Sequence, residues 1–281
     1  MRKIIGYLRA SVVPFLAALA IMSVAMFCFQ SIYQVMLALY IRISGGPEKS
    51  SEGEALFQEV ISGMSGDVNY FISVSSVLIC GIVFYFWYRR EMSGQQRRRL
   101  LSIIKGKNLY FFVMLGIGCQ LFFSGVMSLL QPVFPEQFED YSETVGSILG
   151  SNPLLVIIYM IVIAPVAEEL IFRGVILERM RKTVPFLGAN LLQALFFGIY
   201  HGNIIQGIYA SAMGFLLGLF CHRFRSLSAS ILLHMIINSS VVVVMLFPAA
   251  AASYIIMAVA GAGACVLSFR WLELWKEGSI Q

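Results

Sequence analysis

Long apolar stretches alternate with short polar segments along the whole chain. A helix needs about 20 apolar residues to cross the hydrocarbon core of a bilayer, and many stretches reach this length. The first one, residues 12–41, is longer still. The pattern predicts eight membrane-spanning helices. We expect them at residues 12–41, 69–88, 109–131, 153–178, 186–202, 204–222, 227–247 and 250–269.

The composition agrees with this prediction. Hydrophobic residues make up 59% of the 281 residues, charged residues only 12%, and the mean hydropathy is +0.82. A soluble domain carries roughly twice that share of charge. The fold class is therefore predicted to be all-α, with residues 1–281 forming one integral membrane domain, a polytopic helical bundle. The first apolar stretch is too long for a signal peptide, so we expect a retained first helix. The oligomeric state stays open.

The distribution of charges predicts the orientation. Seventeen Lys and Arg residues lie in the segments 1–11, 89–108, 179–185, 223–226 and 270–281. The segments 42–68 and 132–152 carry two basic and nine acidic residues. An excess of Lys and Arg marks the cytoplasmic side, so both termini are predicted to be inside. Residues 246–281 are then a last helix and a cytoplasmic tail, in a membrane compatible with a bacterial plasma membrane.

The net charge of +5 is explained by this topology. Its densest part, Arg97–Arg99, is predicted to orient the chain and to contact lipid headgroups, and nucleic-acid binding is not expected. On the outer side, the segment 43–68 has apolar residues at helical spacing, which predicts a short helix lying on the membrane surface. A second short helix is predicted near Pro135.

A few polar residues lie within the predicted spans. The acidic ones are Glu168 and Glu169, apart from Glu178 at a span's end, and the basic one is Arg173. Each charge costs at least ~2.5–3.5 kcal/mol at the bilayer centre. All three histidines lie in the same half of the chain, at 201, 222 and 234. These groups are therefore expected to share one site, apart from His222, which is predicted to contact headgroups at the inner boundary.

Helix geometry predicts which side chains meet. Residues four apart share a face, so Glu169 can pair with Arg173, Phe197 lies over His201, and His234 projects with Asn238. Glu168 is rotated by about 100° from Glu169 and can point into a cavity. If the two helices are straight, Glu168 and His201 each lie about 24 Å along their helix from the shared inner turn near Val184.

The same counting places the last motif. From the inner turn near Arg225, Asn238 is about 20 Å up its helix and His234 about 14 Å. We therefore expect Asn238 in one layer with Glu168 and His201. His234 is expected one helical turn nearer the cytosol. On the sixth predicted span, Gly207, Ser211, Gly214 and Gly218 share one face, which predicts close helix packing.

The residue types suggest hydrolysis through an activated water. A carboxylate in an apolar pocket can act as a general base, and a histidine beside it can orient the same water. His234 and Asn238 can donate hydrogen bonds to a developing oxyanion. No Ser or Cys converges with a base at these positions, so a covalent route is not favoured. The most direct substrate is a peptide bond in a membrane-associated peptide or protein.

The motifs E168-E169-x-x-x-R173, F197-x-x-x-H201 and H234-x-x-x-N238, in this order, resemble the CPBP family of intramembrane glutamic endopeptidases. This family includes type II CAAX prenyl endopeptidases and relatives linked to bacteriocin self-immunity. The resemblance covers a core at about residues 150–245, whereas residues 1–131 carry no matching motif. It implies a metal-independent protease without a cofactor. It also implies that Glu168, His201, His234 and Asn238 are catalytic, while Glu169, Arg173 and Phe197 support the site.

Other functions remain open at this stage. Glu168, His201 and His234 are competent zinc ligands, although an H-E-x-x-H motif is absent. The chain could instead be a non-proteolytic membrane partner, such as an immunity protein or a signalling scaffold. Intramembrane Glu and His also occur in proton-coupled transporters. A prenylated CAAX tail, a secreted peptide precursor and a membrane-anchored regulator all fit as substrates.

Overall fold

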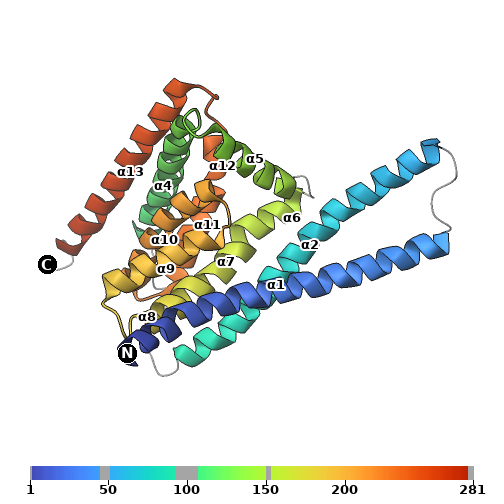
Figure 1. Ribbon diagram of the computed structural model, residues 1–281. Helices are drawn as coiled ribbons and strands as arrows, with labels where there is room; N and C mark the ends of the chain where they lie inside the picture. The colour runs from blue at the N-terminus through green and yellow to red at the C-terminus, as the bar shows by residue number, and fades with distance from the viewer. Residues whose placement is uncertain (1, 45–50, 93–106, 150–152, 278–281) are drawn as a thin grey trace.

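The computed structural model describes residues 2–44, 51–92, 107–149 and 153–277, and these ranges fold into helices with no strand among them (Figure 1). The all-α class is thus confirmed. The longer helices are α1 (Arg2–Ser44), α2 (Ser51–Glu91), α4 (Lys107–Leu130), α5 (Pro135–Leu149), α9 (Phe186–Tyr200), α10 (Ile204–Phe224), α11 (Leu227–Ser239) and α13 (Ala251–Glu277). A single turn, α12 (Val241–Val244), follows α11.

The stretch between α5 and α9 is one continuous rod in which α-helical and wider π-helical turns alternate. Its parts are α6 (Pro153–Ile158), η1 (Tyr159–Ile163), α7 (Ala164–Glu169), η2 (Leu170–Leu177) and α8 (Glu178–Met180). The backbone stays right-handed helical at each junction. We call this element the central rod. Its π-helical segments η1 and η2 flank Glu168 and Glu169, and π-turns inside helices are often found at functional sites.

The chain is an integral, multi-pass membrane protein. Seven stretches within the described helices are long and apolar enough to cross a bilayer: Arg9–Ile43, Val68–Glu91, Leu109–Leu130, Leu154–Met180, Ile204–Phe224, Leu227–Val244 and Ala251–Arg270. The one remaining predicted span, 186–202, corresponds to α9, an apolar helix of only 15 residues. The number of crossings and the orientation in the membrane stay predictions.

Two predictions about surface helices have different outcomes. The segment near Pro135 does form a helix, α5. The segment 43–68 does not form a separate surface helix, because its residues from Ser51 onward are the first turns of α2, which runs unbroken to Glu91. No helix-breaking Pro interrupts α2, so the outer part simply continues the membrane-spanning part. The basic cluster Arg97–Arg99 lies outside the described residues.

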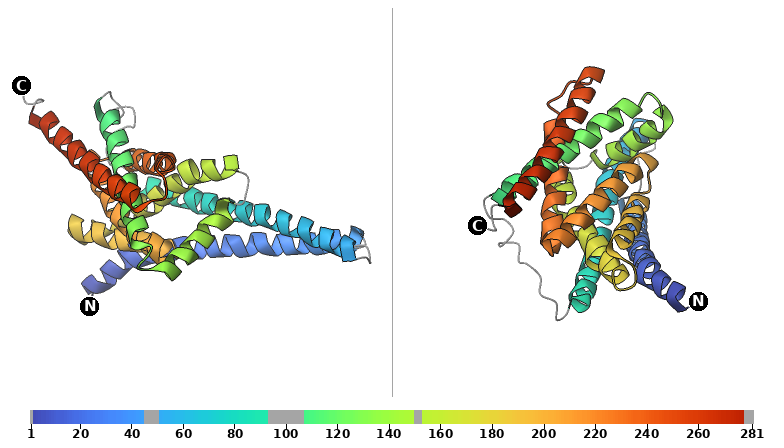
Figure 2. Two further views of the ribbon diagram at one scale, coloured as in Figure 1. Left: turned by 90° about the horizontal axis from the view of Figure 1, so that it is seen from above. Right: turned by 90° about the vertical axis from the view of Figure 1, so that its left-hand side faces the viewer.

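The central rod lies between two pairs of helices. The α1–α2 pair extends far beyond the other helices, and α4 packs along α13 on the opposite side (Figures 1 and 2). Helices α9, α10 and α11 fill the space beside the rod. The beginning of α1 and the end of α13 point toward the same side of Figure 1, as two termini on one side of the membrane would require.

The small residues of α10 allow α9 to approach closely, as predicted. A Cβ at Gly218 would lie 1.8 Å from Asn190 Oδ1, and a Cβ at Gly198 on α9 would lie 2.5 Å from the carbonyl oxygen of Gly207. Both clashes would force the two helices apart. The pair α9–α10 is therefore held by backbone proximity, and this proximity positions the carbonyl of Gly214 for the site described next.

Candidate active site

A fully buried ion pair forms the base of the site. Arg173 Nη1 donates to Glu169 Oε1 at 2.7 Å, and neither side chain is exposed. This confirms the pairing predicted from the four-residue spacing. Because a buried charge is costly unless it is paired and hydrogen-bonded, each group here requires the other.

Helices α9 and α10 hold the guanidinium of Arg173 in place. Its Nη2 donates to the carbonyl oxygen of Gly214 at 2.9 Å, and its Cζ lies 4.5 Å from the centre of the Phe197 ring. The carbonyl of Gly214 also accepts from Gln193 Nε2 at 2.9 Å, and the same nitrogen lies 2.8 Å from Asn190 Oδ1. A Cβ at Gly214 would lie 3.3 Å from the guanidinium.

The sequence did not reveal the roles of Asn190, Gln193 and Gly214. The glycine was noticed only as one of a row of small residues. Two amides buried within an apolar helix were the signal that could have identified the others, since buried polar groups are nearly always hydrogen-bonded.

His234 on α11 bridges the two acidic residues of the rod. Its Nδ1 lies 3.0 Å from Glu169 Oε1, and its Nε2 lies 3.7 Å from Glu168 Oε2. Glu169 is ion-paired and can only accept, so Nδ1 carries the proton, a tautomer assigned from its partner. In the neutral ring the other nitrogen, Nε2, is then unprotonated and faces Glu168. A proton on Nε2 makes the ring an imidazolium.

His201, the residue that caps the end of α9 and begins the turn to α10, is fixed in the same tautomer. Its Nδ1 lies 2.7 Å from the carbonyl oxygen of Phe197, which can only accept, so this nitrogen also carries a proton. The Nε2 of the neutral ring is left as an acceptor. The Phe197 ring stands edge-on to the His201 ring, with centroids 4.7 Å apart, so the F-x-x-x-H spacing both orients and packs the imidazole.

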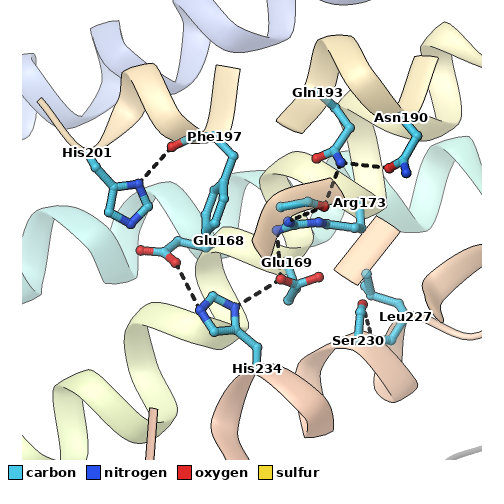
Figure 3. A network of polar contacts seen from close by, with 11 residues as sticks. Glu168, Glu169, Arg173, Asn190, Gln193, Phe197, His201, Leu227, Ser230 and His234 are labelled. Atoms are coloured by element: carbon cyan, nitrogen blue, oxygen red, sulfur yellow. Dashed lines mark hydrogen bonds and ion pairs between the residues drawn. The ribbon is translucent and has the colours of Figure 1, made fainter. Parts of the chain in front are cut away.

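The carboxyl of Glu168 lies between these two imidazoles. Figure 3 shows the His201 ring and the Glu168 carboxyl turned toward each other on one side of the Phe197 ring, with His234 on the other side of the carboxyl. The side chain of Glu168 is 12% exposed, whereas that of Glu169 is fully buried. The two neighbouring carboxyls thus have different surroundings. That of Glu169 completes an ion pair, and that of Glu168 lies between two histidines and is partly exposed.

Asn238 is not placed as straight-helix counting predicted. Its Nδ2 donates to the carbonyl oxygen of Met160 in η1 at 2.8 Å, eight residues before Glu168 on the rod. His234, expected a turn nearer the cytosol, instead contacts the acid directly. The wider π-helical turns change both the rise and the rotation of the rod, so the two helices meet in a different register. The amide of Asn238 is accessible at this position.

The described residues contain no group of three His, Cys, Asp or Glu side chains arranged to hold a metal ion. The alternative zinc set of Glu168, His201 and His234 is therefore not formed in this conformation.

Comparison with known proteins supports the same region of the chain. Residues 150–240 match the model of a protein family described as "Type II CAAX prenyl endopeptidase Rce1-like". A Bacillus subtilis protein named "Putative membrane peptidase YdiL" is 29% identical over 107 residues. That alignment covers 38% of this chain and 43% of the relative, so the chain matches less than half the length of this curated protein. No solved structure matches the chain.

Both matches agree with the resemblance to the CPBP family, which is thereby confirmed. The family match spans all three motifs, from Glu168 to Asn238. It supports a membrane protease of the CAAX type, and the Bacillus relative is consistent with a bacterial origin.

Proposed function

Because residues 150–240 match this protease family, we propose that the protein is an intramembrane glutamic endopeptidase that hydrolyses a peptide bond in a membrane-associated polypeptide. The observation that carries this proposal is the convergence of three side chains from three helices. Glu168, His201 and His234 meet above a buried ion pair that keeps the second carboxyl, Glu169, out of the chemistry.

In the proposed mechanism Glu168 and His201 share the hydrolytic water. The unprotonated Nε2 of His201 accepts one hydrogen bond from it, and the Glu168 carboxylate takes the proton as the oxygen attacks the carbonyl carbon. The carboxyl of Glu168 then passes this proton to the leaving amine. One water is consumed, one peptide bond is broken, and the acid and the amine are released with the enzyme unchanged.

The negative charge on the oxygen of the tetrahedral intermediate needs hydrogen-bond donors that stabilise it. When protonated at Nε2, His234 donates to the oxyanion from that nitrogen, while its Nδ1–H stays on Glu169 and holds the ring in place. Asn238 provides a second donor once its amide leaves the carbonyl of Met160. A lost donor of this kind typically costs about 10²–10³-fold in turnover.

In this proposal Glu169, Arg173 and Phe197 hold the catalytic side chains in place. The ion pair fixes His234 through Nδ1, and the aromatic ring lies against Arg173, His201 and His234. Rigid supporting contacts of this kind are what a preorganised site needs, because donors must already be oriented when charge develops.

The test compares cells that carry the parent protein with cells that carry Glu168→Gln, a change that keeps the shape and removes the base. New protein N-termini in the membrane fraction are measured by mass spectrometry. We expect one or more termini that depend on Glu168, and an accumulating precursor in the variant. Identical termini in both strains, with equal amounts of inserted protein, would exclude the protease.

A metal chelator separates this proposal from the zinc alternative. The proposed chemistry uses side chains alone, so activity on the identified substrate should survive chelation. Loss of activity that zinc restores would instead favour a zinc protease.

A further inference from the structure

Burial along the central rod differs on the two sides of Glu168. The ten residues 169–178 that follow it are all buried, and η2 packs against α1, α2, α9, α10 and α11. On the other side, Ala164, Pro165 and Ala167 are still buried, but none of the five residues of η1 is. Packing therefore closes the route to the site along η2, whereas the rod leaves the packed core at η1.

The turn between α9 and α10 lies on the same open end. It consists of His201, Gly202 and Asn203, with Gly202 at φ +71° and Asn203 capping α10 through its side chain. Gly202 is exposed, and a Cβ placed on it would meet nothing within 4 Å. The backbone here faces open space and not packed side chains.

The lengths of α9 and α10 place this turn at the end of the helix pair that is far from the inner loops. Helix α9 has 15 residues and rises by about 22 Å, whereas α10, which starts at the same turn, has 21 residues and rises by about 32 Å. The second length matches the roughly 30 Å of a hydrocarbon core, so the turn lies near the membrane boundary opposite the loop at residues 179–185. Gly202 is exposed there.

The charge pattern assigns a side to each end of the site. The closed end leads to the loop at residues 179–185, which carries Arg179, Arg181 and Lys182 and no acidic residue. The open end lies beside α5, whose segment 132–152 holds four acidic residues and no basic one. Helix α5 packs against α6, which leads into η1, and against α10, which follows the turn.

We propose that the active site is entered from the extracytoplasmic side. Its substrate is then a polypeptide segment in the outer leaflet or at the outer surface, part of a secreted or membrane-anchored protein and not a cytoplasmic tail. This inference rests on the proposed protease function for its substrate class, whereas the direction of access stands on the burial and charge pattern alone.

Single cysteines on the two sides of the site test the direction of access. Ile204→Cys lies next to the turn and replaces a side chain that is 65% exposed. Met160→Cys, on η1, is a second position on the opposite wall, and its side chain is 36% exposed. The matched control is Thr183→Cys in the exposed inner loop. The parent chain with its five native cysteines sets the background.

A membrane-impermeant maleimide is added to intact cells and, separately, to inverted membrane vesicles. Ile204→Cys and Met160→Cys should be labelled in intact cells, and Thr183→Cys only in inverted vesicles. Labelling of Ile204→Cys from outside should also abolish the Glu168-dependent termini, because the adduct would lie close to His201. Modification of Thr183→Cys should leave them unchanged.

The results separate the two proposals. Labelling of both site cysteines only in inverted vesicles would overturn the outward opening, even if proteolysis is confirmed. Glu168-dependent cleavage confined to cytoplasmic segments of substrates would also overturn it. If labelling occurs from outside but no termini depend on Glu168, the direction of access holds and the protease function fails.

Discussion

Replacing Arg173 by Met should strongly destabilise the protein because it strands a buried carboxylate. Met keeps most of the side-chain volume and removes the charge together with the hydrogen bonds to Glu169 and to the carbonyl of Gly214. Both partners of the ion pair are fully buried. Breaking such a pair by removing one member costs about 3–5 kcal/mol.

The expected loss of stability in Arg173→Met can be measured as a fall in the melting temperature of the protein in detergent. At roughly 2–4 °C per kcal/mol for chains of 150–250 residues, the loss of Arg173 corresponds to a fall of roughly 6–20 °C. The lower end is favoured, because His234 Nδ1 still donates to Glu169. The double variant Glu169→Gln/Arg173→Met leaves no charge stranded and should recover most of the loss.

A matched control separates this effect from the removal of any arginine. Arg181 pairs with Glu178 at 3.0 Å, but its side chain is 32% exposed, and pairs of this kind are worth about 0–1 kcal/mol. Arg181→Met should therefore melt within about 2 °C of the parent. The reasoning is refuted if Arg173→Met melts as high as Arg181→Met, or if the double variant is less stable than the single one.

Further predictions concern catalysis and packing. His201→Ala and His234→Ala should each abolish the Glu168-dependent termini while insertion into the membrane, measured by protein recovered in the membrane fraction, stays normal. Asn238→Ala should reduce turnover of the identified substrate by about 10²–10³-fold, the usual effect of one lost oxyanion donor, and unchanged turnover would remove Asn238 from the mechanism. Gly218→Ala should lower the melting temperature because its Cβ would lie 1.8 Å from Asn190 Oδ1. Gly263→Ala, which meets nothing within 4 Å on α13, should leave it unchanged or raise it slightly, since Ala in a helix is favoured over Gly by about 1 kcal/mol.

Local spacing explains which parts of the site could be predicted from the sequence. The Glu169–Arg173 pair and the packing of Phe197 on His201 are contacts between residues four apart on one helix. Such contacts depend only on helix geometry, which is the same in any fold that keeps the helix. The close packing on α10 could be predicted for a similar reason. Small residues on one face of a helix let any neighbouring helix approach closely.

Contacts between helices could not be predicted in the same way. His234 bridges Glu168 and Glu169, and Asn238 bonds to Met160, although counting along straight helices placed Asn238 beside Glu168. Register between two helices depends on tilt and on the local rise per residue, and the π-helical turns of the central rod change both. No single residue of the central rod predicts those π-helical turns from the sequence.

By itself, the sequence determined that the protein lies in a membrane, which residues are polar inside it, and which family they resemble. These properties follow from composition, from the cost of charge in hydrocarbon and from local periodicity. Only the tertiary structure decided that the segment after Ser51 extends a spanning helix, that α9 has only 15 residues, and which carboxyl is fully buried and which is partly exposed. Burial is a property of all the neighbours together, and those neighbours come from distant parts of the chain.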